Sequence, residues 1–214
     1  MRILLDNDII IKLAALNLLD LFSSLLSDED AAVACLASLP YRLAKKPLEA
    51  NAQTRAVSFV SSCRKLDRAY LAELEIDLDN QELLSTCPGI DAGEAQLLSA
   101  ALAAPDAVVL TGDKRCLMAL CQSSATMPLV PKLQGRVLIL EQLMIEMIRA
   151  IGFDDVKART LRGVHCDTAI RASFGSGPKA EEGNVISTLQ SYVREIDNCC
   201  PGILAPANVL NRLD

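Results

Sequence analysis

The chain has few aromatic residues and almost no histidine. It contains no Trp, three Tyr, four Phe and one His in 214 residues. Aromatic side chains are the usual platforms on which single-stranded nucleic acid stacks, so this composition offers little material for such a surface. His165 has no histidine partner at ligand spacing, and no Cys-x-x-Cys motif is present. A zinc site at His165, Cys166, Cys199 and Cys200 is therefore disfavoured.

Long apolar runs and a secretory signal are also missing. The first apolar run ends at Leu5, and no later segment reaches the roughly 18 uncharged apolar residues that a spanning helix needs. We therefore expect a cytoplasmic protein that does not enter a membrane. The eight cysteines lie mostly inside apolar periodic stretches, and we expect them to be reduced core residues.

Positive charge is in deficit, with 21 Lys and Arg against 27 Asp and Glu. An acidic chain does not bind nucleic acid through its total charge. Local basic clusters remain at Arg42, Lys45 and Lys46, and at Lys114 with Arg115. Any contact with a nucleic acid backbone must come from such clusters.

Short apolar runs alternate with helical periodicity about four times along the first part of the chain. This alternation predicts an α/β fold with a parallel sheet, of α/β/α layering. Strands are expected at residues 3–5, 32–36, 107–110 and 136–140. Helices are expected at residues 9–26, 48–66, 68–74, 91–104, 114–121 and 141–151.

After Gly152 the alternation of short apolar runs with helical periodicity ends, and a loop that contains Gly and Ser interrupts the rest of the chain. Residues 173–179 predict a flexible loop, residues 77–80 a polar turn, and residues 184–197 a helix. We therefore expect one domain at 1–151 and a mostly helical extension at 152–214.

Acidic residues follow two of the predicted strands. Asp6 and Asp8 come directly after residues 3–5, Asp113 follows 107–110, and Glu94 begins a helix. The carboxyl ends of parallel strands share one edge of the sheet, so we expect these acids to meet there. Clustered carboxylates repel one another unless a cation lies between them, and their hard oxygens suit Mg²⁺ or Mn²⁺. The sequence therefore predicts a metal site.

In these motifs, Leu4-Leu5-Asp6-Asn7-Asp8, Gly93-Glu94 and Thr111-Gly112-Asp113, the chain resembles the PIN-domain family over residues 1–151. That family contains α/β nucleases, among them toxin ribonucleases of toxin–antitoxin pairs and RNA-processing enzymes. The resemblance implies a Mg²⁺- or Mn²⁺-dependent endoribonuclease acting on an RNA substrate. It also suggests an inhibitory protein partner and a homodimer.

The resemblance assigns a role to each motif residue. Asp6, Glu94 and Asp113 are the expected catalytic residues and metal ligands, with the metal activating a water. Asn7 and Asp8 are expected to orient those ligands. Lys114 and Arg115 are expected to hold the RNA backbone.

One acid of the family pattern has no counterpart in this chain. The family carries a further acid near the second strand, and residues 39–47 contain none. Glu49 is the nearest candidate. The gap favours an alternative, a PIN-like interaction module without catalytic activity.

Two further interpretations remain open. Asp91 and Glu94 have the spacing of a helix capping box, and Asp6, Asp8 and Asp113 could cap helices that follow strands. Leu5-Asp6-Asn7-Asp8 and Gly112-Asp113 also resemble motifs of haloacid-dehalogenase-like phosphatases. The chain lacks that family's second acid, because the corresponding position is Leu117.

Overall fold

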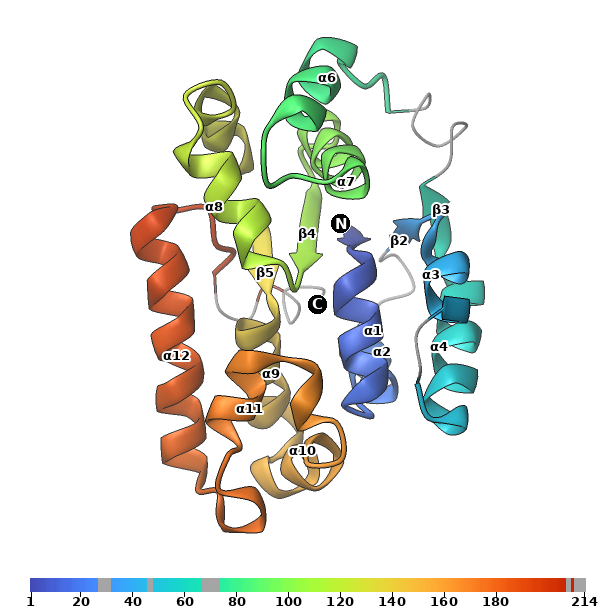
Figure 1. Cartoon of the computed structure of the whole chain (residues 1–214), viewed down its shortest axis with the longest axis vertical. Helices are drawn as coiled ribbons and strands as arrows, with labels where there is room; N and C mark the ends of the chain where they lie inside the picture. The colour runs from blue at the N-terminus through green and yellow to red at the C-terminus, as the bar shows by residue number, and fades with distance from the viewer. Residues whose placement is uncertain (27–31, 46–47, 67–73, 207–208, 210–214) are drawn as a thin grey trace.

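A five-stranded parallel sheet forms the centre of the molecule (Figure 1). The computed structural model describes residues 1–26, 32–45, 48–66, 74–206 and 209. The strand order is β3-β2-β1-β4-β5. The strands are β1 (Arg2–Leu5), β2 (Ala32–Leu36), β3 (Arg64–Leu66), β4 (Ala107–Thr111) and β5 (Val137–Ile139). The predicted parallel α/β architecture is confirmed.

Alternating side chains of each strand enter two separate hydrophobic cores. Ile3 and Leu5 of β1 point into one core, and Leu4 points into the other. Val108 and Leu110 of β4 join the first core, while Val109 joins the second. The period of two in a strand sends apolar residues to both faces, which explains why these runs are apolar throughout.

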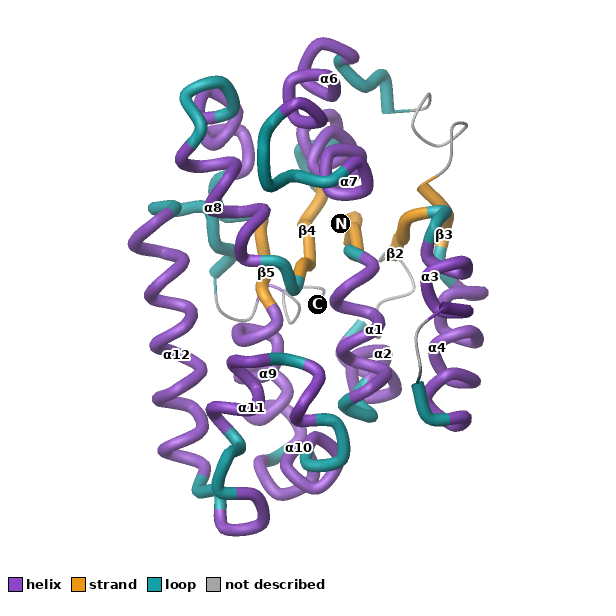
Figure 2. The backbone as a smooth tube through the Cα atoms, in the orientation of Figure 1, coloured by secondary structure: helices purple, strands orange, loops and turns teal. Residues whose placement is uncertain are grey.

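Helices cover both faces of the sheet and make three layers (Figures 1 and 2). The first core lies under α1 (Asn7–Ala15), α2 (Leu19–Leu25), α3 (Leu39–Lys45), α4 (Ala50–Ser62), α9 (Leu140–Ile151), α10 (Phe153–Thr160) and α11 (Thr168–Ser173). The second lies under α6 (Leu78–Thr86), α7 (Ala92–Ala103), α8 (Lys114–Gln122) and the 3₁₀ helix η1 (Met127–Leu133).

Three predicted boundaries are wrong for local reasons. The helix expected at 9–26 is divided between α1 and α2 at Asn17, whose φ of 60° is left-handed and incompatible with a continuing helix. The helix expected at 48–66 ends at Ser62, and β3 follows it. The turn expected at 77–80 is the start of α6, with Asp77 as its N-cap. Most of the helix expected at 68–74 lies outside the described residues.

Residues 152–206 pack closely on the rest of the chain. The long helix α12 (Glu182–Cys199) follows the short η2 (Val164–Cys166) and η3 (Gly177–Lys179). Val185 and Leu189 of α12 belong to the first core, and Ile196 belongs to the second. Beyond α12, Val137 of β5 donates to Ile203 and accepts from Ala205 through its backbone. The extension therefore contributes to both cores and pairs with the outer side of β5.

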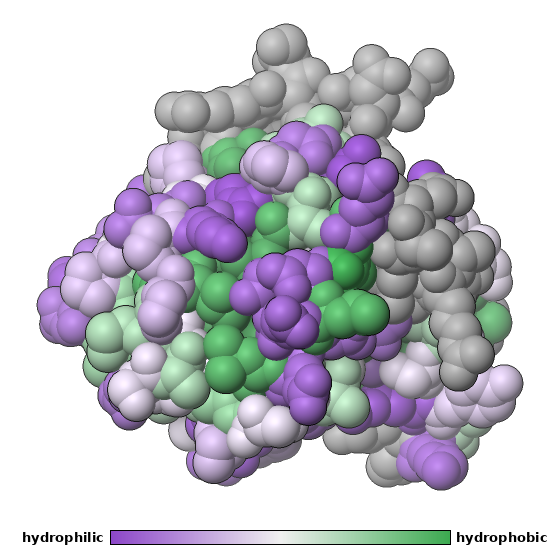
Figure 3. Space-filling model, turned by 90° about the horizontal axis from the view of Figure 1, so that it is seen from above, coloured by the Kyte–Doolittle hydropathy of each residue, from purple (hydrophilic) through white to green (hydrophobic). Residues whose placement is uncertain are grey.

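The surface seen from the α6 end carries apolar side chains surrounded by hydrophilic ones (Figure 3). Leu78 at the start of α6 is 74% exposed, and Met127 at the start of η1 is 51% exposed. Among the described residues, no helix is both long and apolar enough to cross a membrane.

Candidate functional site

The predicted acids lie at the carboxyl edge of the sheet, beside the point where the strand order reverses. The chain runs from β1 outward to β2 and β3, and then returns to the other side of β1 with β4. Asp6 directly follows β1, and Asp113 is separated from β4 by one residue, Gly112. Ligands of open α/β sheets bind in the crevice at such a reversal. Asp6 and Asp113 therefore lie at the position where this topology places a ligand site.

Asp6 is a buried carboxylate with little hydrogen-bonding support. It is 5% exposed and accepts one hydrogen bond from the Thr111 hydroxyl at 3.2 Å. Although it holds the N-cap position of α1, its side chain does not cap that helix. Burial and the negative charge of Asp8 raise the pKa of Asp6 from 3.8 to about 6, against smaller lowering by the Thr111 hydroxyl and by the backbone N–H groups of Asp8 and Asn7. The surroundings of Asp6 therefore disfavour its negative charge.

Glu94 forms the capping box that its spacing predicts. The Glu94 backbone N–H donates to Asp91 Oδ1 at 2.8 Å, and the Asp91 N–H donates to Glu94 Oε2 at 2.6 Å. Burial is the largest cause that raises the pKa of Glu94 from 4.5 to about 7. The backbone hydrogen bond from Asp91 opposes this rise, and the charges of Asp91, Asp113 and Asp6 add to it. Glu94 therefore caps α7 and also belongs to a group of mutually repelling acids.

Asp113 is the N-cap of α8, which confirms the alternative structural role for this residue. Its Oδ1 accepts from the backbone N–H of Arg115 at 2.9 Å and of Cys116 at 3.4 Å, and its Oδ2 pairs with the exposed Arg115 guanidinium at 3.1 Å. These donors outweigh burial and lower the pKa of Asp113. Asp113 and Glu94 share an open pocket of about 360 Å³. Its lining consists of Gly89, Ile90, Asp91, Glu94, Asp113 and Arg115.

Asn7 lies beside Asp6 and has one buried oxygen without a partner. The residue is 1% exposed, and its Nδ2 donates to Ser38 Oγ at 3.2 Å. Among the described residues, its Oδ1 has no hydrogen-bond donor. Buried oxygens are nearly always satisfied by a protein group, a water or an ion. The Asn7 Oδ1 atom is therefore open to such a ligand.

Asp8 is held by a lysine that the sequence argument did not identify. Lys12 Nζ lies 2.6 Å from Asp8 Oδ2 and 2.8 Å from Asp167 Oδ2, and it donates to the Gly112 carbonyl at 3.1 Å. A Cβ atom at Gly112 would lie 2.8 Å from Asp8 Oδ2, so a larger residue at this position would displace the ends of the Asp8 and Lys12 side chains. The i,i+4 spacing of Asp8 and Lys12 was a usable signal for their pairing.

Lys114, predicted to hold the RNA backbone, has partners within the fold, and its contact with RNA stays a prediction. Its ammonium pairs with the carboxylate of Glu141, whose side chain is 2% exposed, and lies 4.8 Å from the centre of the Tyr192 ring. The charge of Lys114 is thus used within the fold to neutralise a buried acid. Arg115 has an 85% exposed side chain at the edge of the pocket.

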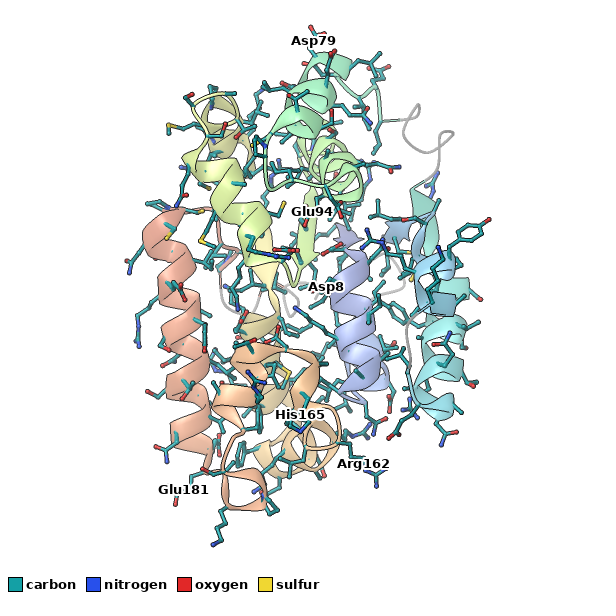
Figure 4. All side chains as sticks on the ribbon, in the orientation of Figure 1. Asp8, Asp79, Glu94, Arg162, His165 and Glu181 are labelled. Atoms are coloured by element: carbon teal, nitrogen blue, oxygen red, sulfur yellow. The ribbon has the colours of Figure 1, made fainter. Side chains whose placement is uncertain are left out.

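Glu49 does not supply the missing acid. It holds the N-cap position of α4 and lines a different pocket, with Ala14 and Ala15 at the far end of α1. Because α1 rises about 1.5 Å per residue, that end lies roughly 12 Å from Asp6. Figure 4 shows Asp8 and Glu94 facing the same region between α1 and α7, with His165 and Arg162 toward the other end of the molecule.

The donor chemistry of the crevice suits a divalent cation, although no compact ligand cluster is formed. Carboxylate and amide oxygens are the ligands that Mg²⁺ and Mn²⁺ prefer, and both the raised pKa values and the free Asn7 Oδ1 fit a bound cation. Within the described residues, no three His, Cys, Asp or Glu side chains are gathered closely enough to hold a metal ion.

No protein-family model matches the chain, and neither a curated protein nor a solved structure matches it. The α/β class is established by the sheet itself. Membership in the PIN-domain family stays a prediction.

Proposed function

We propose that the protein is a PIN-like, metal-dependent ribonuclease whose site is the carboxylate crevice at the ends of β1 and β4. One observation carries the proposal. Asp6 and Glu94 are buried acids with pKa values raised to about 6 and about 7, partly by neighbouring acids, at the edge of the sheet where ligands bind. Repulsion between neighbouring carboxylates does not help a residue to cap a helix. A cation site, in contrast, needs several carboxylates close together, and the bound cation removes their repulsion.

Asp6, Glu94 and Asp113 would hold Mg²⁺ or Mn²⁺, and the Asn7 amide oxygen is available as a further neutral ligand. The cation supplies a water of lowered pKa and neutralises charge on the phosphodiester. Asp8 is oriented by the ammonium group of Lys12, which also donates to the Gly112 carbonyl. Arg115 can bind the RNA backbone once it leaves Asp113, because an exposed ion pair is weak.

A second candidate is an α/β interaction module without catalysis. Two observations favour it: Glu94 and Asp113 both cap helices, and the acid absent from residues 39–47 is not replaced by Glu49. An RNA cleavage assay and a metal-binding assay separate the two candidates.

Asp6→Asn tests the proposed site with little change in shape. Wild-type protein is expected to cleave single-stranded or structured RNA in Mn²⁺, and a chelator should abolish cleavage. Removing one ligand charge from a cation site is expected to lower the rate roughly 100-fold or more, an effect comparable to losing one electrostatic stabiliser of a transition state. Asp106→Asn is the matched control, because Asp106 precedes β4 at the opposite edge and is exposed.

Melting curves with and without Mn²⁺ show whether the crevice binds metal at all. Ligands that bind only the folded state raise the melting temperature, so Mn²⁺ should stabilise wild type and Asp106→Asn but not Asp6→Asn. No Mn²⁺ shift and no cleavage from folded wild type would refute the ribonuclease proposal and leave the interaction module. Hydrolysis of an aryl phosphate but not of RNA would indicate a phosphatase instead.

A further inference from the structure

A second pocket, of about 270 Å³, lies at the far end of α1 and is separate from the carboxylate crevice. The carboxyl end of α1, the first turn of α4 and the residues around η2 form its walls. Its polar lining residues are Asn17, Glu49, Asn51, Arg55, Arg162 and His165. Its volume falls just below the range of about 300–1,000 Å³ that is usual for drug-sized ligands, so it suits a small group.

Two arginines reach this pocket from different elements. Arg55 comes from α4, and Arg162 precedes η2. The Arg55 Nε atom is buried and, in the part of the chain that the structure describes, has no hydrogen-bond partner. A nearby guanidinium, Arg159, already pairs with Asp20 at 2.7 Å. Arg55 therefore retains a buried donor that a ligand can satisfy.

The first turn of α4 lies along one wall of the pocket. This helix has 13 residues, and its N-cap residue Glu49 makes no side-chain capping bond. The N–H groups of Asn51 and Ala52 belong to the first turn, which carries partial positive charge. His165 is exposed at the opposite wall, and Figure 4 shows it and Arg162 in the same lower part of the molecule.

Two features of the pocket oppose an anion. The Glu49 carboxylate lines the same wall, and the carboxyl end of α1 brings partial negative charge through Ala14 and Ala15. The Asp20 carboxylate also interacts with the charge of Arg55 and competes for that guanidinium. The case for an anion therefore rests on Arg55, Arg162 and the first turn of α4 acting together. Replacing the Glu49 carboxylate with a neutral side chain should therefore strengthen the binding of an anion.

We propose that this pocket binds a phosphate group, through Arg55, Arg162 and the amino end of α4. Guanidinium groups match phosphate oxygens with paired hydrogen bonds, and helix amino ends bind phosphate through free N–H groups. The phosphate group is carried either by a free small molecule or by an RNA strand. The pocket does not depend on the ribonuclease proposal, since it shares no residue with the crevice.

Titration calorimetry at constant ionic strength tests the site with the full chain. Inorganic phosphate, a nucleoside 5′-monophosphate and short RNA with a 5′-phosphate or a 5′-hydroxyl serve as probes, and acetate serves as the anion control. Phosphate-bearing probes should bind. Arg55→Gln and Arg162→Gln should each raise the dissociation constant about tenfold, as expected for the loss of a charge-assisted hydrogen bond. Glu49→Gln should lower it.

Arg194→Gln is the matched control, because Arg194 is an exposed residue of α12 that does not line the pocket. It removes the same charge and should leave binding unchanged. Melting curves identify any variant that fails to fold. If Arg162→Gln does not fold, Arg162→Lys takes its place, because it keeps the charge but not the paired donors of the guanidinium. Binding by inorganic phosphate or the mononucleotide assigns a free ligand, and binding by 5′-phosphorylated RNA alone assigns a strand end. No binding by any probe, equal binding by acetate, or equal losses in Arg194→Gln would overturn the proposal.

Discussion

At the scale of single residues, the buried carboxylates of Asp6 and Glu94 reduce the stability of the metal-free protein at neutral pH. Asp6 is buried, accepts one side-chain hydrogen bond and lies near Asp8, so its charged form is disfavoured. Glu94 is in the same situation although it caps α7. Buried acids with raised pKa values are candidates for function, because a neutral side chain at these positions would stabilise the fold more.

This repulsion predicts an unusual pH dependence. Because the pKa of Asp6 is raised from 3.8 to about 6, the folded state binds a proton more tightly, and unfolding free energy should rise as pH falls from 7 toward 4. Asp6→Asn should remove up to about 3 kcal/mol of this change. Urea unfolding of metal-free protein at several pH values measures it, with Asp106→Asn as control. An unchanged slope in Asp6→Asn would contradict the prediction.

At the scale of secondary-structure elements, Lys12 connects three segments. It joins its own helix α1 through Asp8, the β4–α8 connection through the Gly112 carbonyl, and the start of α11 through Asp167. Burial lowers the pKa of Lys12, but the two carboxylates outweigh burial and raise it above its ordinary value. The α11 segment of the extension is thereby tied to the edge of the crevice.

Lys12→Met should be strongly destabilising, since it leaves Asp167 and Asp8 without their shared cation. Removing one partner of a largely buried pair costs about 3 kcal/mol or more. The exposed pair of Arg2 and Asp106 offers a comparison, and Arg2→Met should cost less than about 1 kcal/mol. Denaturant melts at neutral pH measure both. Similar losses for the two variants would show that Lys12 is not structurally special.

The sequence predicts those elements whose signals are local. The alternation of apolar runs with helical periodicity identifies β1, β4 and α7, and the capping-box spacing identifies Asp91 and Glu94. The strand β3 is missed because its sequence, Arg64-Lys65-Leu66, has no apolar run, whereas the equally short β5 is apolar throughout. The partners of Lys114 cannot be recognised because Glu141 and Tyr192 are distant in the chain. The unpaired Oδ1 atom of Asn7 cannot be recognised from the sequence either, because its burial depends on contacts between distant segments.

At the scale of the whole molecule, the extension is part of the packing. Val185 and Leu189 are fully buried in one core, and Ile196 and Ile203 are buried in the other. Burying side chains of this size contributes about 1.5–3 kcal/mol each, so the four together approach the total stability of a typical domain. Residues 1–151 would expose both cores without them.

A fragment of residues 1–151 should therefore fail to unfold cooperatively. Near-ultraviolet circular dichroism and a thermal melt should show lost tertiary packing in the fragment, whereas a chain of residues 1–206 should melt in one transition. A cooperative melt of the short fragment would instead support an independent domain at 1–151 with an appended extension.

The pairing of Val137 with Ile203 and Ala205 also bears on how the protein is made. Residues 203–205 cover the outer side of β5, but they are synthesised well after it. On the ribosome, β5 has an open edge until they emerge, and open strand edges associate readily with other chains. A longer interval between the translation of β5 and that of its covering segment is therefore expected to increase aggregation of the nascent protein.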